Sequence, residues 1–453
     1  MKFNNLEKND IYCIPIGEIF GIEQDEVQIL YAPLSGNYSL ATPTTLEELD
    51  CAIENDNPQK QYVSLLKDFC RRDAFVFDRI PNDTSGLHDI DILVNSKCNF
   101  HCIYCYSAKG RSTQELSFET IKTFIDYLFD GHQNSSEPYS IHFSGGGEPL
   151  MSFDVIKQTI EYIHIACERG NHHTYKLGVV TNGSLLTTEI AKYLHENNVE
   201  IIISFEILER LQNMERGHYS LVASNIDALS DCQIPFGVRT TFTPQSVTCM
   251  CEMVETVVHR FPCIRGLTFD VVLAPSLFPT PHDLEKYYSS FLDNYYKAKQ
   301  LGKSLGVNIF SVAAEPLISL RERYCTGKFV LTPWGKITTC ARVSSPKDDY
   351  YSRYEFGSIS NESVDINDGL FCEIMKQCNI YSIPRCKSCY ARWNCGGGCQ
   401  LFYHQYATEY HRIKCDFTRN ALRLQLFNMI KERYYRQTGR AIEEYVRTKI
   451  KTE

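Results

Sequence analysis

Three closely spaced cysteines are the feature that most constrains this chain. They form the run Cys98-Asn-Phe-His-Cys102-Ile-Tyr-Cys105, with gaps of three and then two residues. Three thiolates at this spacing can surround an iron-sulfur cube and leave its fourth iron without a protein ligand. An open iron suits chemistry rather than storage or structure, because it can hold a small molecule and pass it an electron. The run therefore predicts a reactive cluster.

The composition is that of a large enzyme. The chain has 453 residues, enough for two or three domains, and a formal net charge of -9. This balance argues against general affinity for nucleic acid or anionic membranes, which reward clustered Lys and Arg. Residues 1–10 are polar, and no apolar stretch reaches about 18 residues, so we expect no export signal and no membrane span. We expect a cytoplasmic protein.

The chain contains twenty cysteines, and their grouping indicates metal ligation. Reducing cytosol keeps thiols free, so a disulfide framework is not expected. Ten cysteines outside the groups, such as Cys13, Cys70, Cys167 and Cys232, stand among apolar neighbours and are expected to be small buried side chains. A second group lies in the last third of the chain and comprises Cys325, Cys340, Cys386, Cys389, Cys395, Cys399 and Cys415.

Hydrophobic patterning divides the chain into four parts, which are residues 1–85, 86–315, 316–420 and 421–453. The first part is expected to be a small α+β module with a strand pair, 27–32 and 37–41, a helix opening at Thr44 or Thr45, and a helix over 61–71. The third part holds the second cysteine group. The stretch 418–451 is expected to form one long charged helix. Its apolar face, expected to pack on the second part, comprises Leu422, Leu426, Phe427 and Ile430.

Residues 86–315 alternate expected strands and helices. The strands are expected at 89–94, 139–143, 176–180, 200–204, 237–242 and 266–272. The helices are expected at 118–129, 153–167, 219–229, 248–260 and 284–301. Six such units predict a parallel sheet with crossover helices outside it, that is, an α/β fold with a partial (β/α)6 barrel.

Polar and glycine-rich loops follow the expected strands. In such barrels the chemistry lies at the carboxyl ends of strands, and the first cysteine run follows the first strand. The second strand runs into Ser144-Gly145-Gly146-Gly147-Glu148-Pro149, where glycines let backbone approach a ligand and the carboxylate can accept hydrogen bonds from an ammonium group. The next two strands end in Thr181-Asn182-Gly183-Ser184 and Ser204-Phe205-Glu206. Alone, a glycine-rich turn of this kind often means only a turn.

Placed one unit after the cysteine run, the glycine motif carries a specific resemblance. Over roughly residues 88–420 the chain resembles the radical S-adenosylmethionine (SAM) enzymes, in which three cysteines hold a [4Fe-4S] cluster whose open iron chelates SAM. The resemblance implies that Tyr104 packs beside adenine. It implies that the methionyl amino group is received by Gly145, Gly146, Gly147 and Glu148, three glycines standing where the common pattern has two.

The same resemblance extends to later strands and to the reaction. Asn182, Ser204 and Arg239 resemble ribose and carboxylate contacts, although Arg239 could instead form a structural salt bridge. The implied chemistry is reductive cleavage of SAM to a 5'-deoxyadenosyl radical, which takes a hydrogen atom from the substrate. An external low-potential electron donor, such as flavodoxin or ferredoxin, is then expected.

The second cysteine group resembles the SPASM domain, which holds two auxiliary [4Fe-4S] clusters in radical enzymes that modify peptides and proteins. A pair of zinc knots is the alternative, because Cys-x2-Cys is also a zinc spacing. By the SPASM pattern, the ligands of an outer cluster would be Cys386, Cys389, Cys395 and Cys415. Those of an inner cluster would be Cys325, Cys340 and Cys399.

The inner set contains only three cysteines. Its cluster could therefore have an open iron that binds a substrate thiolate, as a thioether-forming maturase could use. The alternative is a structural or electron-relaying cluster that a nearby cysteine, Cys372 or Cys378, closes.

These features predict a maturase that forms a thioether or carbon crosslink in a ribosomally made peptide. Residues 1–85 loosely resemble the module with which such maturases bind a leader peptide as an edge strand, and the alternative is that they only pack against the barrel. An anaerobic sulfatase-maturing enzyme is the runner-up. Such enzymes typically have an aspartate directly after the second SPASM cysteine, where this chain has Ala341 and then Arg342, so Asp270 is the candidate base. A non-catalytic iron-sulfur or zinc-binding interaction protein is a further class.

Overall fold

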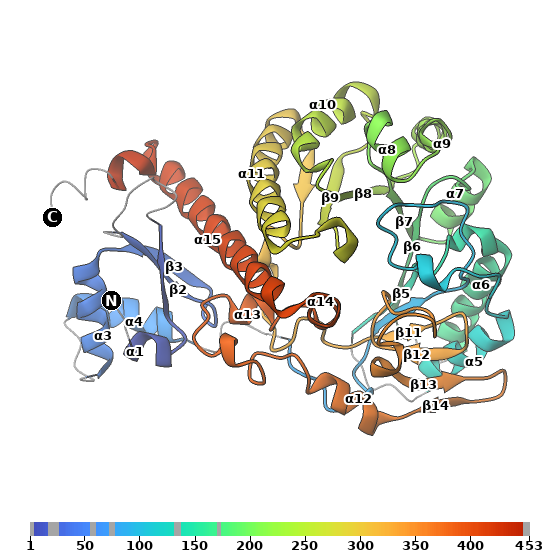
Figure 1. The fold of residues 1–453 in the computed structure, drawn as a ribbon, viewed down its shortest axis with the longest axis horizontal. Helices are drawn as coiled ribbons and strands as arrows, with labels where there is room; N and C mark the ends of the chain where they lie inside the picture. Colours follow the sequence, from blue (N-terminus) through green and yellow to red (C-terminus); the bar gives the residue numbers. More distant parts are fainter. Residues whose placement is uncertain are drawn as a thin grey trace.

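A parallel sheet with helices on its outer side forms the centre of the fold (Figure 1). The structure is a computed structural model that describes residues 4–16, 27–54, 60–71, 78–130, 137–169 and 174–446. The parallel strands are, in spatial order, β10 (Asn308–Phe310), β9 (Gly266–Val271), β8 (Gly237–Phe242), β7 (Val199–Ser204), β6 (Tyr175–Thr181), β5 (Tyr139–Phe143) and β4 (Asp89–Ile92). Because neighbours in the chain are neighbours in the sheet, the expected α/β partial barrel is confirmed, and β10 is a parallel strand beyond the six that were predicted.

Crossover helices cover the outside of this sheet. Ser117 caps the first of them by accepting a hydrogen bond from Thr120 N, and Thr280 forms a capping box with Asp283 at the start of the last. The helices are α5 (Phe118–Phe129), α6 (Phe153–Arg169), α7 (Thr188–Glu196), α8 (Glu209–Glu215), α9 (Tyr219–Asp231), α10 (Met250–Arg260) and α11 (Pro281–Leu305). Helices α7 and α8 are short and were not predicted from the sequence.

The sheet continues beyond β4 into the second cysteine region. Strand β11 (Phe329–Leu331) pairs parallel with β4. Antiparallel strands then follow, namely β12 (Lys336–Thr338), β13 (Glu355–Ile359) and β14 (Val364–Ile366). None of these strands was predicted. They place Cys325 just before β11 and Cys340 just after β12, beside the barrel strand that precedes the first cysteine run.

A long C-terminal helix, α15, begins earlier than predicted and also ends earlier. It spans Thr408–Thr438 and follows the shorter helices α12 (Asp368–Met375), α13 (Arg392–Cys395) and α14 (Gln400–Gln405). The prediction of one helix over 418–451 is wrong, because Gly439 takes a left-handed φ of 67° that ends the helix. Residues 447–451 of that stretch lie outside the described residues.

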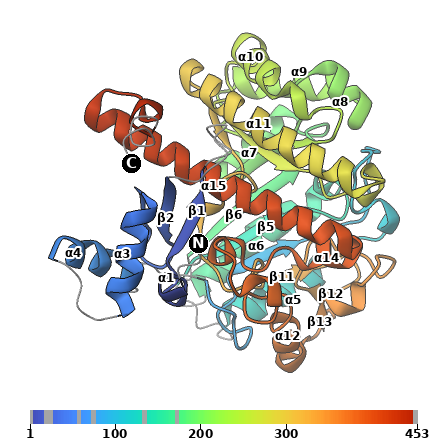
Figure 2. The same cartoon turned by 60° about the vertical axis from the view of Figure 1, so that its left-hand side comes forward.

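Helix α15 lies between the barrel and the N-terminal region (Figures 1 and 2). Its Phe417 stacks on Tyr288 of α11, with ring centres 4.2 Å apart. Its predicted apolar face, from Leu422 to Ile430, packs on the N-terminal sheet and not on the barrel. The predicted apolar face was therefore real, but the predicted partner of that face was wrong.

The N-terminal region forms a small antiparallel sheet with helices, in which the predicted strand pair is joined by β1, a strand that was not predicted. Its strands are β1 (Tyr12–Pro15), β2 (Gln28–Ala32) and β3 (Asn37–Ala41), with β2 in the centre. Its helices are α1 (Asn4–Lys8), α3 (Pro43–Glu54) and α4 (Lys60–Cys70). Successive side chains of β2 point to opposite faces, so Ile29 and Tyr31 pack with α15 while Leu30 and Ala32 pack with α1, α3 and α4.

The N-terminal sheet is also fastened to the second cysteine region. Tyr31 donates a hydrogen bond to Asn394 Oδ1 at 2.9 Å. Asp10 accepts one from Trp393 Nε1 at 3.0 Å and pairs with Arg392. These contacts lie between Cys389 and Cys395.

In the part of the chain that the structure describes, no helix is both long and apolar enough to cross a membrane.

Candidate active site and cysteine groups

A cavity of about 230 Å³ opens at the carboxyl ends of β4 to β9. Parallel strands end at the same edge of a sheet, so loops that are distant in sequence meet there. The predicted cluster ligands, the predicted SAM contacts and the candidate base of the barrel all line this cavity. These residues are Cys98, Cys102, Tyr104, Cys105, Gly145, Gly146, Gly147, Glu148, Asn182, Ser204, Arg239 and Asp270.

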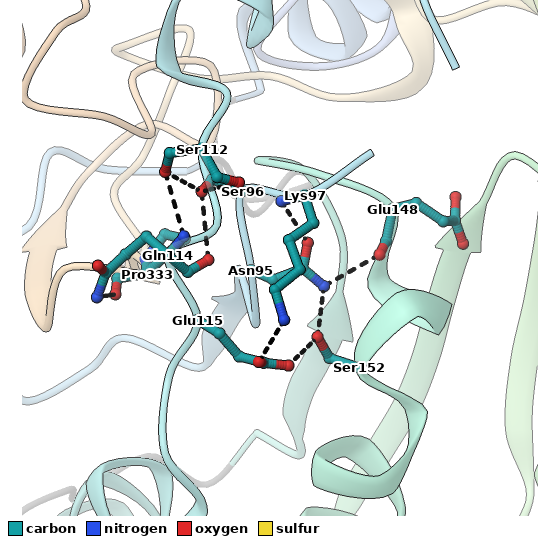
Figure 3. Close-up of polar contacts among 9 residues, drawn as sticks. All are labelled: Asn95, Ser96, Lys97, Ser112, Gln114, Glu115, Glu148, Ser152 and Pro333. Carbon is teal, nitrogen blue, oxygen red and sulfur yellow. Dashed lines mark hydrogen bonds and ion pairs between the residues drawn. The ribbon is translucent and has the colours of Figure 1, made fainter. Parts of the chain in front are cut away.

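The start of the cysteine loop is anchored to the glycine loop (Figure 3). Asn95 Nδ2 donates to the Glu148 carbonyl at 3.1 Å and to Ser152 Oγ at 2.7 Å. Lys97 forms an ion pair with Glu115 at 2.5 Å, and Ser152 donates to the same carboxylate. The two loops therefore form one hydrogen-bonded unit.

A second set of bonds ties this unit to the cysteine-rich region (Figure 3). Ser96 N donates to the Gln114 carbonyl at 3.0 Å, and Ser96 Oγ lies 2.7 Å from Ser112 Oγ. Gln114 Nε2 donates to the Pro333 carbonyl, between β11 and β12, at 3.0 Å. The first cysteine run is thus positioned from both sides.

The glycine loop takes a path that only glycine allows. Gly145 and Gly146 have left-handed φ angles of 58° and 62°. A Cβ on Gly147 would lie 1.8 Å from the Lys97 carbonyl oxygen. Each of the three glycines is therefore required by the backbone, and the backbone itself forms this wall of the cavity.

Glu148 joins the loops after β5 and β6. It is 2% exposed, and its Oε1 accepts from Thr181 Oγ1 at 2.5 Å and from Leu150 N at 3.2 Å. Its Oε2 accepts from Asn182 N at 2.7 Å. Burial raises the pKa of Glu148, and these donated bonds oppose the rise. The carboxylate positions the loops, and its contact with a methionyl amino group stays a prediction.

Tyr104 belongs to a buried charged network that the sequence analysis largely missed. Its hydroxyl donates to Glu206, which is 0% exposed, and accepts from Arg216 Nη1 at 3.0 Å. Burial raises the pKa of Glu206 to about 8, although Arg216 opposes the rise. Arg216 follows the unpredicted helix α8, so no spacing signal pointed to it.

Cations surround the thiols of the first cysteine run. Burial raises the pKa of Cys98 and Cys102, whereas Arg111 opposes this at Cys98 and Arg216 at Cys102. Arg111 Nη2 also lies 3.5 Å from Cys105 Sγ. Nearby cations favour the thiolate, which is the form that binds metal. The residues present therefore fit a cluster held by three thiolates, and a basic residue close after the run was the available sequence signal.

The far side of the cavity carries an ion pair. Arg239 Nε lies 3.1 Å from Asp270 Oδ2, across the neighbouring strands β8 and β9. The structural salt bridge weighed for Arg239 is therefore present. Both side chains are partly exposed to the cavity, and Ser204 is the partner of Arg239 in the pairing of β7 with β8. Asp270 stays a candidate base.

Arg342 forms the wall between the cavity and the second cysteine group. Its guanidinium carbon lies 5.4 Å from the centre of the Tyr106 ring. Both residues line the cavity, and neither was predicted to do so. Its position two residues after Cys340 was the available signal.

The four cysteines of the predicted outer set lie together. Burial raises the pKa of Cys395 to about 12, and the charges of Cys389, Cys415 and Cys386 add to the rise. Arg385 Nε donates to Cys415 Sγ at 3.3 Å. These four thiols are therefore near one another, and their role as ligands of one cluster stays a prediction.

The three cysteines of the predicted inner set form a separate group. Burial raises the pKa of Cys340 to about 12, with additional effects from Cys325 and Cys399. Within the described ranges, no three His, Cys, Asp or Glu side chains come close enough to share a single metal ion. An iron-sulfur cube bonds its thiolates to different irons, so its ligands need not converge on one ion.

The remaining cysteines differ from the prediction that they are buried. Cys70 and Cys51 are exposed, and Cys13, Cys167 and Cys232 are only partly buried. The prediction was wrong because apolar neighbours in the sequence of a helix do not all share its buried face. Cys70, for example, is the last residue of α4.

Residues 92–257, from β4 into α10, match the radical SAM superfamily. The chain contains a radical SAM domain. The second cysteine group lies outside the matched residues, and its assignment to a SPASM domain stays a prediction. The match covers the cysteine run, the glycine loop and strands β5 to β8, and it ends before β9.

Several known proteins are similar to this radical SAM enzyme in sequence. It is 28% identical over 193 residues to an uncharacterised protein of Methanocaldococcus jannaschii. This match covers 41% of this chain and 63% of that protein. It is 22% identical over 325 residues to a cysteine-type anaerobic sulfatase-maturating enzyme of Clostridium novyi, covering 65% of this chain and 85% of that enzyme.

Solved structures share the fold of this radical SAM enzyme. The structure of anSMEcpe with bound AdoMet superposes with a TM-score of 0.57 at 15% identity, covering 76% of this chain and 95% of that one. Streptococcus suis SuiB bound to precursor peptide SuiA gives a TM-score of 0.52 at 16% identity, covering 82% of this chain and 80% of that one.

Proposed function

We propose that this radical SAM enzyme is a maturase that forms a thioether or carbon crosslink in a ribosomally made peptide. The observation that carries the proposal is the N-terminal sheet fastened to the cysteine-rich region through Tyr31 and Asp10. Within the described residues, β3 pairs with β2 on one side and with no strand on the other. Such an edge can take up an extended peptide as an additional strand. SuiB, of similar fold, is described with a bound precursor peptide.

The first cysteine run would hold the reactive [4Fe-4S] cluster. When bound, the cluster and SAM supply one electron and an adenosyl radical that takes a hydrogen atom from the substrate. The glycine loop would present backbone to the methionyl end, and Arg239 would pair with the carboxylate of SAM in exchange for Asp270. Arg216 and Glu206 hold Tyr104 at the position proposed for adenine.

Crosslink formation requires a second oxidation step. The peptide loses two hydrogen atoms in total, one taken as an atom by the adenosyl carbon and one released as a proton and an electron. Asp270 would accept the proton at its carboxylate once Arg239 turns to SAM. The auxiliary clusters would accept the electron, and an external low-potential donor would supply the electron that starts each turnover.

The auxiliary clusters would be held by the two cysteine sets. Cationic side chains lie near both, Arg385 at the outer set and Arg342 at the inner set. Positive charge beside a thiolate cluster offsets its negative charge and favours its reduced form. The inner set is next to the cavity wall formed by Arg342, which suits electron transfer between the substrate and the cluster.

Sulfatase maturation is the second candidate. The likeness to the Clostridium novyi enzyme favours it, as does the fold of anSMEcpe, which is described with a bound Kp18Cys peptide. The residue after the second SPASM cysteine opposes it, because this position is Ala341 and carries no carboxylate. Asp270 would have to replace that base.

One experiment separates these functions. The anaerobically reconstituted protein is supplied with SAM, dithionite and short cysteine-containing peptides, including any encoded beside it, and the products are analysed by mass spectrometry. We expect 5'-deoxyadenosine and a peptide that has lost two hydrogen atoms. An aldehyde trapped by a hydrazide would support formylglycine formation instead. A variant with Cys98, Cys102 and Cys105 replaced by Ala is the control and should cleave no SAM. Bound zinc without SAM cleavage in the unaltered protein would support the non-catalytic class.

A further inference from the structure

One buried arginine gathers three cysteine-bearing segments of the second cysteine region. Arg323, 3% exposed, donates from Nη1 to the Cys325 carbonyl and from Nε to the Gln377 carbonyl at 3.0 Å. Its Nη2 donates to Gln400 Oε1 at 2.7 Å. Gln400 follows Cys399, and Gln377 precedes Cys378. The segments of Cys325, Cys378 and Cys399 are therefore joined to a single guanidinium group.

The backbone places Cys378 beside the segment that leads to Cys325. Asn379 forms an antiparallel bridge with Arg323, and Ile380 N donates to the Glu322 carbonyl at 3.0 Å. Gln377 is held from a second direction, because Gln400 Nε2 donates to its Oε1 at 2.8 Å. The position of Cys378 is thus set by paired backbone and buried side chains.

The glycines between Cys395 and Cys399 allow this approach. Gly396, Gly397 and Gly398 all have left-handed φ angles, of 60°, 83° and 85°. A Cβ on Gly397 would lie 3.1 Å from the Cys378 carbonyl oxygen, and one on Gly396 would lie 2.5 Å from Tyr324 N. The chain that carries Cys399 therefore passes directly beside both neighbouring segments.

The charges around Cys378 agree with this placement. Burial raises the pKa of Cys378, Arg323 and Arg385 oppose the rise, and the charge of Cys399 adds to it. Burial raises the pKa of the Tyr354 hydroxyl. The charges of four thiols add to the rise, namely those of Cys340, Cys399, Cys325 and Cys378. Within that group, the thiol whose charge acts on Cys378 is Cys399.

Cys372 lies in a different environment. It is on α12, and its Sγ donates to the Asn82 carbonyl at 2.6 Å. That contact ties α12 to the loop that precedes the barrel. The two cysteines left open by the sequence are therefore distinguished by their neighbours.

We propose that Cys378 is the fourth protein ligand of the inner auxiliary cluster. The inference rests on the proposed assignment of Cys325, Cys340 and Cys399 to that cluster. A cluster with four protein thiolates has no open iron for a substrate thiolate. The inner cluster then relays electrons, and the substrate is bound by the cavity and the peptide module alone.

The test counts iron on a background without the reactive cluster. The chain with Cys98, Cys102 and Cys105 replaced by Ala retains only the auxiliary sites and should bind about eight irons. Adding Cys378→Ala should remove between about one and about four irons, leaving a [3Fe-4S] cluster or none at the inner site. Adding Cys372→Ala, the matched control, should remove none.

A second measurement needs no substitution at Cys378. On the same background, cyanide should leave the electron paramagnetic resonance spectrum of the reduced protein unchanged, because no iron is open. A cyanide-induced shift with Cys378 present, or full iron retention by Cys378→Ala, would overturn the inference while leaving the auxiliary clusters intact. Iron loss in Cys372→Ala alone would also overturn it. A background protein without iron would overturn the proposed cluster assignment as well.

Discussion

Among the hydrogen-bonding side chains at the cavity, Glu148 is expected to lower the free energy of unfolding most when it is replaced. Its carboxylate accepts from Thr181 Oγ1, at the end of β6, and from Leu150 N and Asn182 N in the segments after β5 and β6. In Glu148→Ala, two buried N–H groups lose their acceptor, and each costs about 1 to 3 kcal/mol. The free energy of unfolding should therefore fall by about 2 to 6 kcal/mol.

The amide variant should cost less. In Glu148→Gln the remaining carbonyl oxygen can still accept from Asn182 N. The NH2 group then faces both Leu150 N and the Thr181 hydroxyl, which donate to the same oxygen in the unaltered protein. Only the hydroxyl can turn to accept, so one buried N–H group is left unpaired at a cost of about 1 to 3 kcal/mol. The control Thr181→Val removes one donor to Glu148 and the acceptor of Gly183 N, at 3.0 Å, and should cost about 1 to 2 kcal/mol.

Urea unfolding of the anaerobic proteins, followed by circular dichroism, measures these differences. SAM affinity from calorimetry should fall with stability, because the loops that Glu148 joins line the cavity. Equal losses for Glu148→Ala and Glu148→Gln would refute the hydrogen-bond reasoning. A loss below about 1 kcal/mol for Glu148→Ala would refute it as well.

Two further predictions concern Glu206 and Tyr31. The pKa of Glu206 is raised from 4.5 to about 8, mainly by burial, so the folded protein binds this proton more tightly than the unfolded chain does. The free energy of unfolding should therefore fall by at most about 5 kcal/mol as the pH rises between these values. Urea unfolding at several pH values measures this fall, which should be smaller in Glu206→Gln. Equal slopes of unfolding free energy against pH in the two proteins would contradict the prediction. Tyr31→Phe removes the bond to Asn394 and should lower the free energy of unfolding by about 1 to 2 kcal/mol, whereas Tyr435→Phe, 63% exposed, should change it by less than about 0.5 kcal/mol. Equal effects of the two tyrosine variants would exclude a docking role for Tyr31.

Long elements with regular periodicity could be predicted from the sequence. The predicted helix 118–129 and strands 139–143 and 237–242 have the same bounds in the structure. Short elements could not, because β11, β12 and β14 have three residues each and owe their form to pairing with distant strands. Helix α8, with seven residues, is similarly brief, and it precedes Arg216.

The barrel side of the cavity was also predictable, for a physical reason. Residues after successive parallel strands must meet at one edge, so locating the strands also located the site. The wall toward the second cysteine group was not predictable. Arg342 and Tyr106 meet across more than two hundred residues of sequence, and no local pattern reports that contact.

For the apolar face of α15, too, one part could be predicted from the sequence and another could not. Its spacing identified which side chains are buried, since a helix presents every third or fourth residue on one side. It did not identify what covers them. The N-terminal sheet does so, because Ile29 and Tyr31 of β2 present a complementary apolar face.

By itself, the sequence determined the ligand-bearing loops. The gaps in Cys98, Cys102 and Cys105 place three thiolates within reach of one cluster, because a few residues of chain limit how far apart they can lie. Only the tertiary structure distinguishes the two cysteines that could join the proposed inner set of Cys325, Cys340 and Cys399. Cys372 and Cys378 are nearly equivalent in the chain, but buried Arg323 draws the segment of Cys378 alone to this group.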